Sequence, residues 1–148
     1  MGVRVERLHD IPAGAAELVS DSERSGLRFV RKLVEDWISA ENRFDRPGEA
    51  LFGAFLDRRM VGVCGLNIDP YVTDDGVGRL RHLYVLADFR HAGVARALMA
   101  HVLAAGRGRF DHLRLRTNNP AAARLYESFG FQVTPESADS THVLPLAR

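Results

Sequence analysis

The stretch that decides the fold is Phe89-Arg-His-Ala-Gly-Val-Ala-Arg-Ala-Leu-Met-Ala-His-Val-Leu-Ala-Ala-Gly106, in which a glycine stands where a helix begins. Gly93 is among the poorest helix formers, whereas the alanines and leucines that follow it are among the best. Val94, Leu98 and Val102 recur at i, i+4 and i+8. This spacing predicts a helix whose apolar face packs against a sheet.

The turn before this helix has the features of an anion-binding site. The first N–H groups of a helix have no partner inside it, and the helix dipole favours negative charge at that end. Gly93 has no Cβ to block a phosphate, Ala95 is also small, and Arg90 and Arg96 supply positive charge on either side. The pattern Arg-x-x-Gly-x-Ala is short, however. A loop whose glycine only relieves crowding explains the same residues equally well.

The rest of the chain predicts an α/β (α+β) domain around a mixed sheet, in the order β-α-α-β-β-β-α-β-α-β. Expected strands cover 3–8, 50–56, 59–68, 77–86 and 112–116, with one or two more from 131–133 and 141–144. Expected helices open at Ile11-Pro12-Ala13, run from Leu27 to about Ala40, and follow Asn119-Pro120. Asparagine before proline is a good N-cap with proline in the first helical position.

Composition limits the class of protein. The 148 residues are expected to form a single domain over 1–148. Twenty basic and 19 acidic side chains leave a formal charge of +1, which gives no argument for a nucleic-acid or membrane partner. The single cysteine, Cys64, stands in an apolar run and is expected to be buried. With no long apolar segment at the N-terminus, the expected location is the cytoplasm, and no metal is expected.

Several segments together resemble the GCN5-related N-acetyltransferase (GNAT) family. They are Leu83-Tyr-Val85, Phe89-Arg-His-Ala-Gly-Val-Ala95, Asn119-Pro-Ala-Ala-Ala-Arg-Leu-Tyr126 and Phe129-Gly-Phe131. The similar region spans roughly 77–132, and the combination at this separation is specific, although the glycine loop alone is weak. The resemblance implies a GNAT-like fold and transfer of an acetyl group from acetyl-CoA to a primary amine of a small molecule or peptide.

The resemblance also implies which residues hold the cofactor. Leu83, Tyr84 and Val85 would offer backbone groups to the pantetheine arm, as an added strand does. Asn119 would contact that arm in addition to its capping role. The residues expected around the pyrophosphate are Arg90, His91, Ala92, Gly93, Val94, Ala95 and Arg96.

Tyr126 is the candidate general acid. The thiolate that leaves the thioester should be protonated, and a phenol of pKa about 10 can donate a proton at neutral pH. The resemblance places Tyr126 near the sulfur, and the competing interpretation is a core tyrosine packed with Leu125 and Phe129. A backbone N–H near Val85 would stabilise the carbonyl oxygen.

A general base is harder to identify. Some GNAT proteins carry Glu or His in the strand that corresponds to 77–86, where this chain has Arg79 and Arg81, which are not bases at ordinary pH. His82 has a suitable unperturbed pKa of about 6.5, but a regular strand would point it to the opposite face unless a bulge rotates it. His82 is the candidate base. There are two alternatives: His82 only packs in the structure, or the amine arrives neutral and needs no base.

Arg79 and Arg81 also bear on the acceptor. Two guanidinium groups beside the acceptor would repel a polyamine and suit a carboxylate or phosphate, so a small amine with an acidic group is expected. The other interpretation is that both are solvated or pair with Asp74 and Asp75. Acceptor specificity is expected from 12–46, 69–76 and 135–142. Within or near these segments Tyr71 and Phe44 could line a pocket, whereas Trp37 is expected in the core.

Two other classes compete with the enzyme. A non-catalytic acyl-CoA-binding module would keep the cleft without turnover, and the missing strand carboxylate favours it while Tyr126 opposes it. An arginine-rich nucleic-acid binder is disfavoured, because no basic cluster is interleaved with aromatic residues. A homodimer is possible through an exposed strand at Val143-Leu-Pro-Leu146, although Pro145 limits the pairing.

Overall fold

The structure is a computed structural model that describes residues 2–134 and 138–146. The elements follow the predicted order, with two separate strands at the C-terminal end. They are β1 (Arg4–Arg7), α1 (Ala15–Arg24), α2 (Phe29–Ser39), β2 (Ala50–Leu56), β3 (Arg59–Ile68), β4 (Val77–Val85), the 3₁₀ turn η1 (Ala87–Phe89), α3 (Val94–Gly106), β5 (His112–Leu115), α4 (Pro120–Ser128), β6 (Gln132–Val133) and β7 (His142–Pro145).

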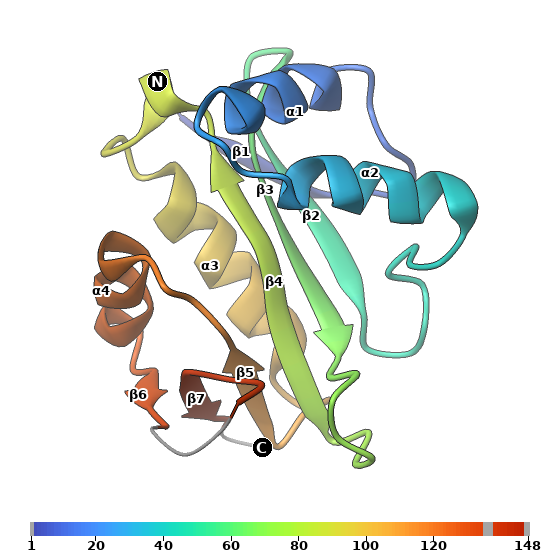
Figure 1. Cartoon of the computed structure of the whole chain (residues 1–148), viewed down its shortest axis with the longest axis vertical. Helices are drawn as coiled ribbons and strands as arrows, with labels where there is room; N and C mark the ends of the chain where they lie inside the picture. The colour runs from blue at the N-terminus through green and yellow to red at the C-terminus, as the bar shows by residue number, and fades with distance from the viewer. Residues whose placement is uncertain (1, 135–137, 147–148) are drawn as a thin grey trace.

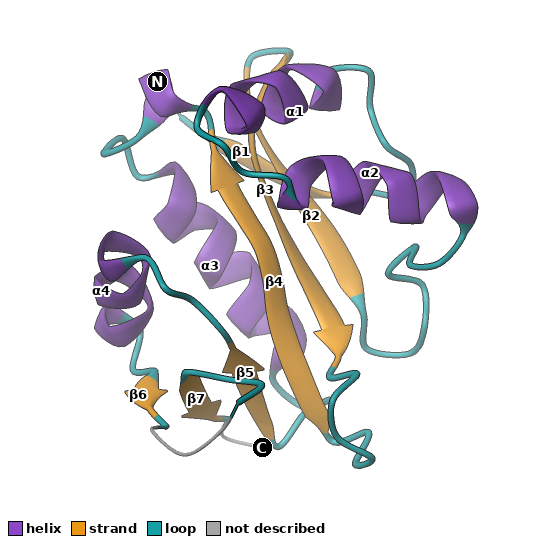
Figure 2. Ribbon diagram, in the orientation of Figure 1, coloured by secondary structure: helices purple, strands orange, loops and turns teal. Residues whose placement is uncertain are grey.

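The strands form one seven-stranded sheet in the order β1-β2-β3-β4-β5-β7-β6 (Figure 2). Only the β4–β5 pair in the middle is parallel, and it is short, extending from Val77↔His112 to Arg79↔Arg114. Beyond that point β4 continues to Val85, while β5 ends at Leu115. The two strands therefore diverge, and residues 80–85 of β4 have no partner strand on that side among the described residues (Figure 1).

The helices cover both faces of the sheet. Helices α1 and α2 lie over one face, and α3 lies over the other (Figure 1). The predicted stripe of Val94, Leu98 and Val102 is buried, with at most 1% of each residue exposed. The helix comes so close to the sheet that a Cβ at Gly62 would lie 3.0 Å from side-chain atoms of Leu98 and Val94. Close packing of α3 thus fixes where its N-terminus stands relative to β4.

Some local expectations differ from the structure. The first helix begins at Ala15 with Gly14 as its N-cap, and not at Ile11-Pro12-Ala13. Ile38, which continues the apolar spacing of α2, is 72% exposed, whereas Trp37 is buried in the core as expected. The apolar residues of α2 form a stripe along one side of the helix. Trp37 lies in the part of the stripe that packs against the core, and Ile38 lies at its edge.

The C-terminal strand is not a free edge. Val143 pairs with Arg114 of β5 on one side and with Gln132 of β6 on the other. The expected dimer would pair the strand at 143–146 with a second copy. At Val143 this pairing is blocked, because both sides of the residue already pair with strands of the same chain. Of the segment 135–142, expected to shape the acceptor site, residues 135–137 lie outside the described part of the chain.

The remaining chain-wide expectations concern the cysteine, metal and membrane. Cys64 is fully buried in β3, as expected, and burial raises the pKa of its thiol to about 12. Within the described ranges, no group of His, Cys, Asp and Glu side chains is arranged to hold a metal ion. None of the helices there combines the length and the apolar composition that crossing a membrane requires.

Candidate active site

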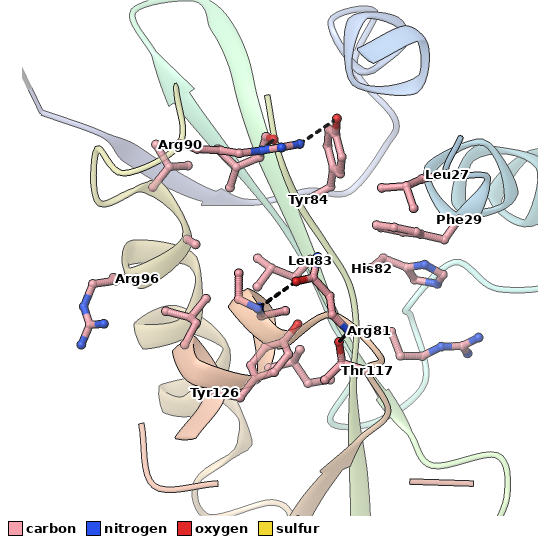
Figure 3. Close-up of a pocket in the computed structure, with 18 of the residues that line it drawn as sticks. Leu27, Phe29, Arg81, His82, Leu83, Tyr84, Arg90, Arg96, Thr117 and Tyr126 are labelled. Carbon is pink, nitrogen blue, oxygen red and sulfur yellow. Dashed lines mark hydrogen bonds between the residues drawn. The ribbon is translucent and has the colours of Figure 1, made fainter. Parts of the chain in front are cut away.

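A cleft of about 1130 Å³ opens where β4 and β5 diverge, and α3 and α4 contribute to its walls (Figure 3). The expected site residues gather in this one cleft, with the exception of Ala92. Those that line it are Arg79, Arg81, His82, Leu83, Tyr84, Val85, Arg90, His91, Gly93, Val94, Ala95, Arg96, Asn119 and Tyr126. The topology thus joins the strand, the glycine turn and the second helix of the sequence motif.

Gly93 is the N-cap of α3 and has φ +83°, a left-handed conformation that favours glycine. His91, two residues earlier, is also left-handed, with φ +64°. A Cβ at Gly93 would meet nothing within 4 Å, so the glycine does not relieve crowding within the protein. No side chain of the described residues caps the helix, so its first N–H groups stay available at the wall of the cleft, which is the arrangement that favours an anion.

The two arginines beside this turn are held by the protein. Arg90 donates from Nε to the carbonyl of Val85 at 3.1 Å and from Nη2 to the hydroxyl of Tyr84 at 3.2 Å (Figure 3). Arg96 donates to Oγ of Ser128 at 3.2 Å and lies 4.8 Å from the ring centroid of Phe129. Both guanidinium groups therefore stay at the cleft with restricted freedom, one fixed to β4 and the other to α4.

The side chain of Tyr84 is held by helix α1. Its hydroxyl donates to Asp21 of α1 at 2.6 Å, and the same carboxylate accepts from the backbone N–H of Ala87 at 3.0 Å. Burial and the bond to Asp21 raise the pKa of Tyr84 to about 12. The phenol of Tyr84 is therefore engaged by Asp21 and Arg90.

Asn119 caps α4, as its position before Pro120 predicted. Its Oδ1 accepts from the backbone N–H groups of Ala121 at 2.9 Å and Ala122 at 3.3 Å. Asn119 also lines the cleft, as Gly93 and Val94 at the start of α3 do.

Tyr126 is 7% exposed, and burial raises the pKa of its phenol. Its ring packs edge-on against Phe131 with the centroids 5.9 Å apart. The hydroxyl has no hydrogen-bond partner among the described residues, although every fully buried side-chain polar atom there has one. The hydroxyl is therefore open to the cleft and stays protonated across the neutral range (Figure 3).

His82 lies in a β-bulge of β4. A bulge is the condition under which the sequence predicted that His82 would turn toward the face of Arg81. Val63 and Gly65 are two residues apart on β3, whereas their partners Tyr84 and Arg81 are three residues apart on β4. His82 and Leu83 of β4 therefore stand opposite the single residue Cys64 of β3, and His82 has φ +61°. The bulge breaks the alternation of the strand, so Arg81 and His82 point to the same side of β4 in Figure 3.

The environment of His82 makes it a weak base. Its ring stacks on Phe29 at 6.3 Å and meets Phe44 edge-on at 6.2 Å between centroids. Burial, with a smaller contribution from the charge of Arg81, lowers the pKa of His82 to about 4. The imidazole is therefore neutral at pH 7, and it accepts a proton only weakly, because the base strength of a group falls with its pKa.

Arg79 is engaged by groups of the protein. Its Nη1 lies 3.2 Å from Oδ2 of Asp69, and its Nη2 donates to the carbonyl of Asp139 at 2.6 Å. Tyr71 covers the guanidinium face at 4.6 Å from the ring centroid. The alternative that Arg79 is solvated or pairs with Asp74 and Asp75 is wrong, because Arg79 is buried and its ionic partner is Asp69. Arg79 lines the cleft without a free set of donors.

The sequence interpretation missed part of the wall. Arg116, Thr117 and Asn118 line the cleft from the β5–α4 loop, and Leu27 and Phe29 line it from the start of α2. Arg116, Thr117 and Asn118 directly precede Asn119 in the sequence. Their position next to the Asn119 motif could therefore have indicated that they line the same site. The chain has 19 acidic residues, yet no Asp or Glu of the described residues lines the cleft.

Comparison with known proteins agrees with this geometry. A sequence-family model described as "Acetyltransferase (GNAT) family" matches residues 15–131. A search of the curated proteins by sequence found no match.

Solved structures share the fold over nearly the whole chain. A proposed acetyltransferase from Exiguobacterium sp. 255-15 is 26% identical with a TM-score of 0.88, over 98% of this chain and 94% of that one. PaiA N-acetyltransferase from Thermoplasma acidophilum, in complex with coenzyme A, is 17% identical with a TM-score of 0.70, over 97% and 98%. The ribosomal-protein-S18-alanine N-acetyltransferase of Escherichia coli is 17% identical with a TM-score of 0.70, over 99% and 96%. At 17% identity these two comparisons show the fold alone.

Proposed function

This chain belongs to the GNAT acetyltransferase family, and we propose that it transfers an acetyl group from acetyl-CoA to a primary amine of a small molecule or peptide. One observation carries the proposal. The uncapped start of α3, the part of β4 that is not paired with β5, and the hydroxyl of Tyr126 all face the same cleft. Together they supply an anion site, a strand edge for an amide-bearing arm, and a proton donor.

The residues present fit acetyl-CoA. The N–H groups at the start of α3, with Arg90 and Arg96 beside them, would hold the diphosphate. The free edge of β4 near Leu83 and Val85 would pair with the amides of the pantetheine arm. Asn119 of the opposite wall would donate to the same arm. In this arrangement the thioester reaches the region between β4 and Tyr126.

The proposed reaction is direct attack of the amine nitrogen on the thioester carbonyl. The N–C bond forms as the C–S bond breaks, and a backbone N–H of β4 near Val85 stabilises the carbonyl oxygen as charge develops. Tyr126 donates its phenolic proton to the departing sulfur, a step that is worth about 10²- to 10⁴-fold in rate. Once the N–C bond has formed, the nitrogen releases its surplus proton through water to the phenolate, so that Tyr126 is protonated again and the products are an amide and a thiol. The raised pKa of Tyr126 ensures that the proton is present at neutral pH.

The proton of the acceptor ammonium leaves by another route. No Asp or Glu in the described part of the cleft can take it, and His82 is a weak base because burial lowers its pKa to about 4. We therefore propose that the amine reacts after losing its proton to solvent. This predicts a rate that rises with the neutral fraction of the amine and not with a protein group that titrates near pH 6.5.

An acetyl-transfer assay tests the proposal. Purified chain, acetyl-CoA and a panel of amines are mixed, thiol release is followed, and the acetylated product is identified by mass spectrometry. We expect amine-dependent release of CoA with at least one class of amine. Thiol release without an acetylated amine, or none with any amine, would contradict the transferase.

The alternative is an acyl-CoA-binding module without turnover. It is favoured by the cleft's lack of a carboxylate among the described residues and by the weak basicity of His82. Binding of acetyl-CoA in the absence of any transfer would support this module, and it is the outcome that separates the two functions.

A further inference from the structure

Arg79 of β4 and Arg114 of β5 are partners in the last pair of the parallel ladder. Both lie close to the carboxylate of Asp69, with N–O distances of 3.2 Å and 3.6 Å. The side chain of Asp69 is fully buried. In this row of the sheet, one carboxylate therefore bridges two arginines that come from neighbouring strands.

The next row repeats the arginines. Arg81 and Arg116 each stand two residues further along the chain. A strand period of two places Arg81 on the same face of β4 as Arg79, whereas Arg116 directly follows the end of β5 at Leu115. Arg81 still pairs regularly with Gly65 of β3, so the bulge begins only after it. Both arginines line the cleft at the point where β4 and β5 separate.

The two pairs of arginines differ in whether an acidic side chain lies beside them. In the described residues, neither Arg81 nor Arg116 has an ion pair or a side-chain hydrogen bond. The cleft that they line has no aspartate or glutamate there either. The position that Asp69 fills in the first row thus has no protein carboxylate in the second.

We propose that Arg81 and Arg116 bind a carboxylate of the acceptor, so that the acceptor is an amino acid or a similar amine that carries a carboxylate. This rests on the proposed acetyltransferase function. Two guanidinium groups repel a diamine, because the charges have the same sign. They favour an acid, because charge-assisted hydrogen bonds to a carboxylate are about twice as strong as neutral ones. Arg79, predicted with Arg81 to bind substrate, has its donors occupied by Asp69 and Asp139 and is not part of this pair.

The wall beside this pair suggests the rest of the acceptor. Leu27 and Phe29 line the cleft from the α2 side, and Phe29 stacks on the neutral ring of His82. Figure 3 shows Arg81 on the same side of β4 as His82 and Phe29. Amino acids with apolar side chains are therefore the first acceptors to test.

The first experiment compares amines that differ in the carboxylate. Phenylalanine, phenylalaninamide and 2-phenylethylamine are compared by kcat/KM, with each rate corrected for the neutral fraction of its amine. Hydrogen bonds to charged groups of typical strength predict a preference of about 10- to 150-fold for phenylalanine over both others. Equal use of the three amines would overturn the proposal. A preference for phosphoethanolamine over phenylalanine would also overturn it, in favour of a phosphate.

The second experiment removes the arginines one at a time. Arg81→Met and Arg116→Met should each raise the KM for phenylalanine about 10-fold or more. The KM values for acetyl-CoA and 2-phenylethylamine should stay within about twofold of wild type. Arg58→Met is the matched control, because Arg58 is exposed in the β2–β3 turn and lies outside the cleft. Retained preference for phenylalanine in both cleft variants would refute the assignment.

A binding measurement separates this proposal from the activity. N-acetylphenylalanine is titrated by calorimetry into the chain saturated with CoA, which requires no turnover. Binding that weakens at least 10-fold in Arg81→Met and Arg116→Met supports the carboxylate site even if no amine is acetylated. Undetectable binding to wild type, or equal binding to the variants, overturns it. Acetylation of amines regardless of a carboxylate would leave the transferase standing and remove only this inference.

Discussion

Oδ2 of Asp69 lies 3.2 Å from Nη1 of Arg79, and the two side chains are 0% and 7% exposed. Burial lowers the pKa of Arg79, while the charge of Asp69 raises it in compensation. This pair lies where β4 and β5 begin to separate, so it stabilises the base of the cleft.

The first prediction concerns this buried pair. Arg79→Met should lower the free energy of unfolding by about 3–5 kcal/mol, because it leaves the Asp69 carboxylate buried without its main partner. The double variant Arg79→Met, Asp69→Asn should recover part of the loss. Urea unfolding measures all three proteins, with Arg58→Met as the exposed control. An unfolding free energy for Arg79→Met within 0.5 kcal/mol (roughly the range of surface substitutions) would contradict this role.

The second prediction concerns the turn at Gly93. With φ +83° and open space around its Cβ position, substitution is limited by backbone conformation and not by volume. Gly93→Ala should destabilise the fold by about 1–2 kcal/mol, and Gly93→Asn by less, because asparagine adopts the left-handed region more readily. Thermal and urea unfolding measure the order. Equal stability of the two variants would show that φ is not the constraint at this residue.

The third prediction is a pH dependence of stability. Burial lowers the pKa of His82 from 6.5 to about 4, so between these values the unfolded chain binds a proton that the folded chain does not. Stability from this group is full above pH 6.5 and decreases as the pH falls toward 4, by about 2 kcal/mol at pH 5. Urea unfolding of wild type and His82→Asn at pH 7.5 and pH 5 measures the difference. Parallel pH profiles would mean that His82 titrates normally in the folded chain.

The fourth prediction concerns catalysis by Tyr126. Tyr126→Phe should lower kcat about 10²- to 10⁴-fold while the dissociation constant of acetyl-CoA changes little, since only the proton donor is removed. Tyr71→Phe is the matched control, because it removes the hydroxyl of a tyrosine that is 54% exposed at the edge of the same cleft. Steady-state kinetics and calorimetry provide the two constants. Similar losses in both variants would argue against a specific role for the phenol of Tyr126.

Features set by neighbouring residues could be predicted from the sequence. The start of α3 at Val94, the cap at Asn119 and the two-residue hairpin at Asp57-Arg58 each follow from local spacing and turn chemistry. The element order followed from the same signals. The resemblance then indicated which of these elements meet, and the structure brings all but Ala92 of the expected site residues to one cleft.

Features set by distant residues could not be predicted in this way. Asp69, and not Asp74 or Asp75, pairs with Arg79, because the choice depends on how the turn after β3 folds back on β4. The weak basicity of His82 depends on rings contributed by Phe29 and Phe44, which are far away in the sequence. Arg116 belongs to the site only through the parallel register of β4 and β5.

The central claim is that acetyl-CoA lies between β4 and α4 with its diphosphate at the start of α3. The most direct test is a titration of ¹⁵N-labelled protein with acetyl-CoA, followed by amide NMR. The amide resonances of Gly93, Val94 and Ala95, and those of Leu83 and Val85, should shift together and saturate at one equivalent. Unchanged resonances at these amides, or saturable shifts confined to other parts of the chain, would contradict the account.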